Sequence, residues 1–146
     1  MKKLVYILML LILSLIEKSF LGELFGAFSP NLILALAFAL GSSQKYDLAL
    51  FTAFFGGLFV DLASFNIFGL TTFTYTVGLF LSSLIKKYVF KGLHAQFFML
   101  FLVYLTYQVV LTYVTRSHLF VLNFFAGFVS TFILYLSFYI LARKAD

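Results

Sequence analysis

Residues able to carry chemistry are few in this chain and lie far apart. Five side chains are acidic, two are histidines and none is a cysteine. His94 and His118 fall in separate polar breaks, too distant to share a metal ion or a proton relay. The chain contains no paired carboxylates on one helix face, HExxH motif, Ser–His pair or phosphate-cradling glycine loop. The sequence therefore predicts a protein that is not an enzyme and that uses no cofactor or metal.

Asp61 is the acidic residue that lies within a predicted membrane span. It lies within an apolar run, where an acidic side chain costs about 2.5–3.5 kcal/mol on insertion scales. Two interpretations are open. Either the carboxylate caps the bend that follows and accepts hydrogen bonds from backbone N–H groups or from Thr71 and Thr72, or it makes a functional contact.

A second polar group follows one face of a later apolar run. Its members are spaced four residues apart and so share a helix face. They are Tyr104, Gln108, Thr112 and Arg116. The favoured interpretation is a hydrogen-bonded seam against a neighbouring helix. Arg116, at the outer end, extends toward the membrane interface or approaches Asp61.

The elements that position these residues are predicted to be membrane helices. Of 146 residues, 64% are hydrophobic and 10% are charged, and the mean hydropathy is +1.11. Soluble domains are about 45–50% apolar and about 25% charged, so a water-soluble domain is excluded, as is a disordered chain. The apolar runs are continuous, whereas strands of a membrane barrel alternate. We therefore expect an all-α integral membrane protein with one polytopic domain, residues 1–146.

Six transmembrane helices are expected, separated by short polar breaks. Their approximate ranges are 4–26, 31–43, 48–65, 70–86, 95–114 and 119–142. The first depends on a helix that continues past Ile16, with Glu17, Lys18 and Glu23 facing other helices or the interface. A half-crossing segment is the alternative. A cleaved signal peptide is disfavoured because no small-x-small cleavage site follows Ile16.

The basic residues predict the orientation in the membrane. With six crossings, eight of the ten cations fall on one side, and Lys18 and Arg116 fall on the other. The eight are Lys2, Lys3, Lys45, Lys86, Lys87, Lys91, Arg143 and Lys144. The positive-inside rule then places both termini in the cytoplasm. This explains the net charge of +5 without nucleic acid, although the cluster at 86–91 also suits anionic lipid.

Small residues recur every fourth position in several runs, as expected at close helix contacts in lipid. The series are Asn31, Ala35, Ala39 and Ser43; Ala49, Ala53, Gly57 and Asp61; Thr74, Gly78 and Ser82, with Thr71 before them; and Asn123, Gly127 and Thr131. We call each series a small-residue stripe. Tight packing within a helix bundle is enough to explain nearly all of them.

The order of motif residues across residues 30–78 resembles the rod shape-determining protein MreD family. Pro30 and Asn31 open the second run, and Gly56-Gly57-Leu58-x-x-Asp61-Leu62-x-Ser64 closes the third. Gly69, Tyr75 and Gly78 follow in the fourth run. The order of these motif residues carries the resemblance.

The resemblance implies a non-catalytic protein of the bacterial cytoplasmic membrane. MreD-like proteins belong to the machinery that builds lateral peptidoglycan and maintains rod shape. The implied partner is an MreC-like single-span protein, with the MreB filament, RodA and a class B penicillin-binding protein more distant. The implied fold is similar to the substrate-binding subunits of energy-coupling-factor transporters.

Two classes of function stay open. In the first, a small-residue stripe that includes Gly57 receives the transmembrane helix of the MreC-like partner, and Asp61 and Ser64 fix the bend at the outer mouth. Handling of a lipid-linked wall precursor is not separable from this by sequence. In the second, the chain is a transporter subunit that holds a vitamin-like molecule beneath the bend. Its polar lining would be Asp61, Asn66, Gln108, Arg116 and Asn123.

Overall fold

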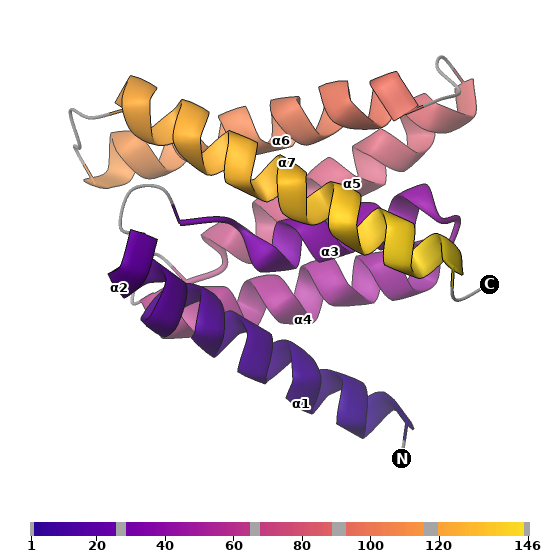
Figure 1. The fold of residues 1–146 in the computed structure, drawn as a ribbon, viewed down its shortest axis with the longest axis horizontal. Coiled ribbons are helices and arrows are strands. Elements are labelled where there is room, and N and C mark those ends of the chain that lie inside the picture. Colours follow the sequence, from indigo (N-terminus) through magenta and orange to yellow (C-terminus); the bar gives the residue numbers. More distant parts are fainter. Residues whose placement is uncertain (1, 26–28, 65–67, 89–92, 116–119, 145–146) are drawn as a thin grey trace.

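The computed structural model describes residues 2–25, 29–64, 68–88, 93–115 and 120–144, and every regular element in these ranges is a helix (Figure 1). In chain order the elements are α1 (Lys2–Leu15), η1 (Ile16–Leu21), α2 (Gly22–Phe25), α3 (Leu32–Ser42), α4 (Tyr46–Ser64), α5 (Leu70–Tyr88), α6 (Leu93–Thr115) and α7 (Phe120–Lys144). The predicted all-α class is confirmed for this part of the chain, and the helices follow the six predicted runs in order.

Within the described residues, four helical segments are long and apolar enough to cross a membrane. They are Lys3–Phe25, Tyr46–Ser64, His94–Tyr113 and Phe124–Lys144. The first shows that the helix does continue past Ile16, through the π-helical turn η1 and into α2. α3 is a shorter apolar helix of 11 residues, and α5 is not among the four.

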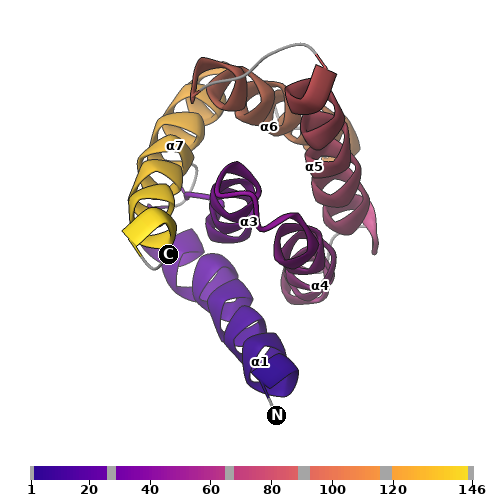
Figure 2. The same ribbon diagram turned by 90° about the vertical axis from the view of Figure 1, so that its right-hand side faces the viewer.

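α3 is the core of the bundle. Figure 2 shows α5, α6 and α7 in an arc around it, with α4 beside it inside the arc and α1 on the remaining side. All of α3 except Leu36 and Ser42 is buried. A helix that is apolar on every face must be enclosed in this way, and at about 1.5 Å per residue α3 is only about 16 Å long. Its N-terminus therefore ends inside the bundle, where its N–H groups need protein partners.

The small-residue stripes form the contacts between these helices. Ala35 and Ala39 of α3 and Ala49 and Ala53 of α4 are completely buried. Because these side chains are small, the backbones of neighbouring helices approach closely, which is how helices associate in lipid. The stripes therefore hold this chain together.

Both termini lie at the same end of the bundle, the right-hand end in Figure 1. α1 and α4 begin there, and α3, α5 and α7 end there. The helix ends at this side carry most of the described basic residues. They are Lys3, Lys45, Lys86, Arg143 and Lys144. Lys18, in η1, belongs to the opposite end, so the charge asymmetry seen in the sequence is also an asymmetry of the fold.

Candidate functional site

Asp61 caps the N-terminus of α5. The side chain lies in the last turn of α4 and is 2% exposed. Its Oδ1 accepts a hydrogen bond from Thr71 N (2.9 Å), and its Oδ2 accepts from Gly69 N (3.1 Å), Thr72 N (3.1 Å) and Thr72 Oγ1 (2.9 Å). The N–H groups at the start of a helix have no partner within the helix. The N-terminus is also the positive end of the helix dipole, which favours an anion there. The structure thus contains the capping arrangement, the first of the two interpretations.

Two glycines make this cap possible. Gly69 has φ +90°, a left-handed conformation that favours glycine and turns the chain into α5. Gly57 lies one helical turn before Asp61, where an added Cβ would be 2.7 Å from the Cα of Thr72. The backbones of α4 and α5 therefore touch at Gly57. Ser64 donates to the backbone oxygen of Asp61 at 3.4 Å, within α4 itself.

The face of α4 that contains Gly57 packs against helices of the same chain, which differs from the expected docking of a partner helix there. The stripe that contains Gly57 was expected to receive a partner helix. The structure instead places α5 of the same chain directly against Gly57, and its neighbour Gly56 faces the side chain of Ile33 in α3. This face of α4 is therefore already occupied by helices of the same chain.

Glu17 is a second buried cap, which sequence reasoning did not assign. The residue lies in η1 and is 1% exposed, and its Oε2 accepts a hydrogen bond from Ile33 N at 3.0 Å. It thereby satisfies a free N–H group at the buried start of α3. An acidic residue inside a long apolar run was the one sequence feature that could have indicated this cap. The π-helical turn that directs Glu17 toward α3 has no signature in the sequence.

Lys18 brings a positive charge next to these caps. Its Nζ lies 3.9 Å from Oε1 of Glu17. It also interacts electrostatically with Asp61 and Tyr107, and Tyr75 interacts in the same way with both carboxylates. We call the residues linked by these interactions the internal polar cluster: Glu17, Lys18, Asp61, Tyr75, Tyr104 and Tyr107.

Some buried polar atoms form no hydrogen bond to a described residue. In the cluster these are Glu17 Oε1, whose contact is the ion pair with Lys18, and Tyr75 Oη, and a third is Asn31 Nδ2, just before α3. The ring of Tyr75, which is fully buried, lies 5.4 Å from the ring of Tyr107. A buried polar atom without a hydrogen-bond partner is unfavourable, so ordered water is the expected partner of such atoms.

The remaining motif residues join other helices. Pro30 is buried ahead of α3, and the backbone N–H of Asn31 donates to Thr131 Oγ1 of α7 at 3.0 Å. Gly78 faces α6, where an added Cβ would lie 2.5 Å from Cγ2 of Val103. These motif residues therefore have structural roles within this chain.

The polar series on α6 differs from the expected seam between helices. Gln108 Nε2 donates to Tyr104 Oη at 3.1 Å, a bond within α6 itself. Tyr104 reaches α7, because an added Cβ at Gly127 would collide with its hydroxyl. Thr112 is partly buried. Arg116 lies outside the described residues.

Only two of the five residues predicted to line a small-molecule pocket have a described side chain. Asp61 and Gln108 are both engaged in hydrogen bonds within the chain. Asn66 lies outside the described residues, as does Arg116, and the side chain of Asn123 is also not described. The structure therefore brings together a different set of polar residues, the internal polar cluster.

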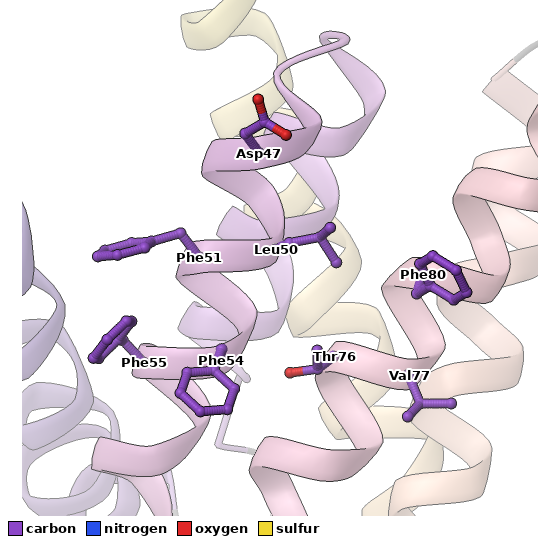
Figure 3. Close-up of a pocket in the computed structure, with 8 residues that line it drawn as sticks. All are labelled: Asp47, Leu50, Phe51, Phe54, Phe55, Thr76, Val77 and Phe80. Atoms are coloured by element: carbon purple, nitrogen blue, oxygen red, sulfur yellow. The ribbon is translucent and has the colours of Figure 1, made fainter.

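The outer surface has grooves on both sides of α5. One, of about 590 Å³, lies between α4 and α5 (Figure 3), and another, of about 560 Å³, lies between α5 and α6. Large apolar side chains of α5 project outward beside them, among them Phe73 (69% exposed) and Phe80 (51% exposed). This face of the bundle has room for another apolar element.

Fold and site together define a class: an all-helical protein with several helices able to span a membrane, whose buried charges join its own helices. In the described ranges no three His, Cys, Asp or Glu side chains are grouped so that they could hold a metal ion. No protein-family model, curated protein or solved structure matches the chain.

Proposed function

We propose that this protein is a non-catalytic membrane scaffold of the bacterial cell-elongation machinery, similar to the MreD family. In this proposal it resides in the cytoplasmic membrane and helps to maintain rod shape during lateral peptidoglycan synthesis. It acts by binding the transmembrane helix of an MreC-like single-span protein. Through that partner it connects with MreB, RodA and a class B penicillin-binding protein.

The observation that carries this proposal is the open apolar face of α5. The motif residues that resemble the MreD family, such as Gly57, Asp61 and Gly78, are used to hold α4, α5 and α6 together. They present α5 with a groove on each side. Helices in lipid associate by close packing, and a groove of this kind offers a surface for such packing.

The proposal includes six crossings with both termini in the cytoplasm. α3 and α5 would then lie at membrane depth together with the four longer helical segments. The end that carries Lys3, Lys45 and Lys86 would face the cytoplasm under the positive-inside rule. A six-helix bundle of this kind would also be similar to the substrate-binding subunits of energy-coupling-factor transporters.

Depletion of the protein in its own host tests the role in cell shape. We expect rods to become round, and we expect the MreC-like protein to co-purify with the tagged chain in mild detergent. Normal rods after depletion, together with no co-purification, would reject the scaffold function.

A second candidate function is favoured by a separate observation. Glu17, Asn31 and Tyr75 each have a buried polar atom that forms no hydrogen bond to a described residue, as they would in a subunit that holds a vitamin-like molecule for transport. Extraction of small molecules from the purified protein tests this function. A stoichiometric vitamin or nucleobase, with reduced uptake after depletion and unchanged cell shape, would favour transport.

A further inference from the structure

The hollow between α1 and α4 carries one charge of each sign. Lys3 of α1 and Asp47 of α4 both line it, and both residues are exposed. We infer that this hollow binds the headgroup of phosphatidylethanolamine, a zwitterionic phospholipid, with the lipid phosphate at Lys3 and the lipid ammonium at Asp47. The inference does not depend on the scaffold function, because it concerns a lipid and not a protein partner.

The two helices place these charges at the depth of lipid headgroups. α1 and α4 begin at the same end of the bundle, and Lys3 and Asp47 lie in their first turns (Figure 1). The corresponding membrane-spanning segments begin at Lys3 and Tyr46. Both charges therefore lie where the apolar helices meet the polar layer of the bilayer, which is where a phospholipid carries its phosphate and its amine.

Neither charge is neutralised by a described residue. Lys3 and Asp47 line the same hollow but form no ion pair with each other, and neither side chain pairs with another described residue. A phosphoethanolamine headgroup carries a negative and a positive group that complement both side chains at once. A ligand with only one sign of charge would match one side chain and be repelled by the other.

Each charge lies one helical turn before an aromatic ring on the same face. Lys3 precedes Tyr6 by three residues, and Asp47 precedes Phe51 by four. Figure 3 shows Phe51 pointing away from α5, and its ring centroid lies 6.0 Å from that of Tyr6 in α1. The two rings thus contact each other and form an apolar floor beneath the charges, suited to the glycerol and upper acyl chain of a lipid.

A hydrogen bond holds the floor of the hollow together. Tyr6 Oη lies 2.6 Å from Thr52 Oγ1, and Thr52 donates its own proton to Leu48 O at 2.7 Å, so Tyr6 is the donor. This bond ties α1 to α4 directly below the charged residues. The hollow has a volume of about 470 Å³, within the range of about 300–1,000 Å³ that is usual for small-molecule pockets.

The chemistry of the two side chains favours phosphatidylethanolamine over other phospholipids. A carboxylate accepts hydrogen bonds, and a primary ammonium donates them, whereas the quaternary ammonium of phosphatidylcholine has no N–H group. Quaternary ammonium groups are held by aromatic cages, but the rings of Tyr6 and Phe51 contact each other and leave no space between them. Phosphatidylglycerol has a phosphate for Lys3 but no cation for Asp47.

Native mass spectrometry of the purified full chain tests this selectivity. The delipidated protein in detergent is titrated with phosphatidylethanolamine, phosphatidylcholine or phosphatidylglycerol of identical acyl chains. We expect one phosphatidylethanolamine to bind about tenfold more tightly than either of the others, the effect of one charge-assisted hydrogen bond. Equal binding of all three lipids would show that only the apolar floor acts, and tightest binding of phosphatidylglycerol would show that Asp47 plays no part. Either result would overturn the inference.

Charge variants assign the two ends of the headgroup. Asp47→Asn should lower the affinity for phosphatidylethanolamine about tenfold, to that of phosphatidylcholine. Lys3→Gln should weaken binding of all three lipids. The matched controls are Lys144→Gln, at the same end of the bundle on α7, and Glu23→Gln, at the opposite end, and both should leave the affinities unchanged. A preference for phosphatidylethanolamine that survives Asp47→Asn, or equal effects of Lys3→Gln and Lys144→Gln, would contradict the inference.

A blocking variant gives an independent test of the location. Leu48 lines the hollow and is 38% exposed, so Leu48→Trp adds volume to the hollow without entering the core. We expect this variant to lose phosphatidylethanolamine binding while its melting temperature in the delipidated state stays unchanged. Undiminished lipid binding by a folded Leu48→Trp protein would place the lipid elsewhere and reject the site.

Discussion

The carboxylate of Glu17 accepts a hydrogen bond from the backbone N–H of Ile33 at 3.0 Å, so the π-helical turn η1 of the first helical segment caps the start of α3. Asp61 repeats this device between α4 and α5, where its Oδ1 lies 2.9 Å from Thr71 N. In both cases a buried acidic residue meets the free N–H groups of a helix N-terminus. The pairing allows a helix to begin inside an apolar bundle, and it explains why this chain retains two acidic residues there.

Replacement of Glu17 tests the first cap. Glu17→Leu leaves the Ile33 N–H and the Lys18 ammonium without their acidic partner, and we expect the free energy of unfolding to fall by about 3 kcal/mol. Glu17→Gln keeps an acceptor oxygen and should cost less. Thermal unfolding in detergent measures the difference. The exposed Glu23→Gln is the control, and equal melting temperatures for all three variants would argue against the cap.

Replacement of Asp61 by Asn tests the second cap. An amide has one acceptor oxygen, so the Asp61 bond to Thr71 N or those to Gly69 and Thr72 are lost, and an N–H group then faces another N–H group. We expect a loss of about 2 kcal/mol in stability. Asp47→Asn, at an exposed position, should leave the melting temperature of the isolated protein unchanged. A similar shift for both variants would contradict this prediction.

The close contact between α4 and α5 predicts an intolerant glycine. Gly57→Ala would bring a methyl group to 2.7 Å from the Cα of Thr72, and the two helices must separate. Overpacking of this kind costs about 2 kcal/mol. In Gly22→Ala, the nearest atom lies 3.8 Å away, so this matched variant should be neutral or slightly stabilising. Detergent unfolding curves of the two variants decide the question.

Tyr104 and Gly127 should be energetically coupled. An added Cβ at Gly127 collides with the Tyr104 hydroxyl, so Gly127→Ala alone is expected to destabilise the contact between α6 and α7. Tyr104→Phe removes the colliding oxygen and the hydrogen bond from Gln108. A double-mutant cycle should therefore show the Gly127→Ala cost reduced in the Tyr104→Phe background. Strict additivity would show that the two residues do not meet.

Single cysteines can test the proposed orientation in intact cells. Lys45→Cys and Arg143→Cys should be protected from a membrane-impermeant thiol reagent, because the positive-inside rule places this end in the cytoplasm. Glu23→Cys, at the opposite end, should be labelled. Labelling of Lys45→Cys before cell lysis would reject the proposed topology.

Much of the architecture follows from local properties of the sequence. Apolar runs of helical length predicted the helices in their correct order, and charge asymmetry predicted two chemically distinct bundle ends. The four-residue spacing of Ala49, Ala53 and Gly57 predicted a packed face. These features are readable because hydropathy and helix periodicity depend only on neighbouring residues.

The partners of the polar groups were decided by the tertiary structure. Glu17 and Ile33 are 16 residues apart, and Asn31 and Thr131 are 100 residues apart, so no local pattern could pair them. Gly56 and Gly57 are adjacent in sequence yet face different helices, because successive helical positions point about 100° apart. The free hydroxyl of Thr76 and the bonded hydroxyl of Thr74 are likewise indistinguishable by residue type. The sequence by itself determined a helical membrane protein and its two ends, while packing in three dimensions decided which residues join its helices and which surface stays open.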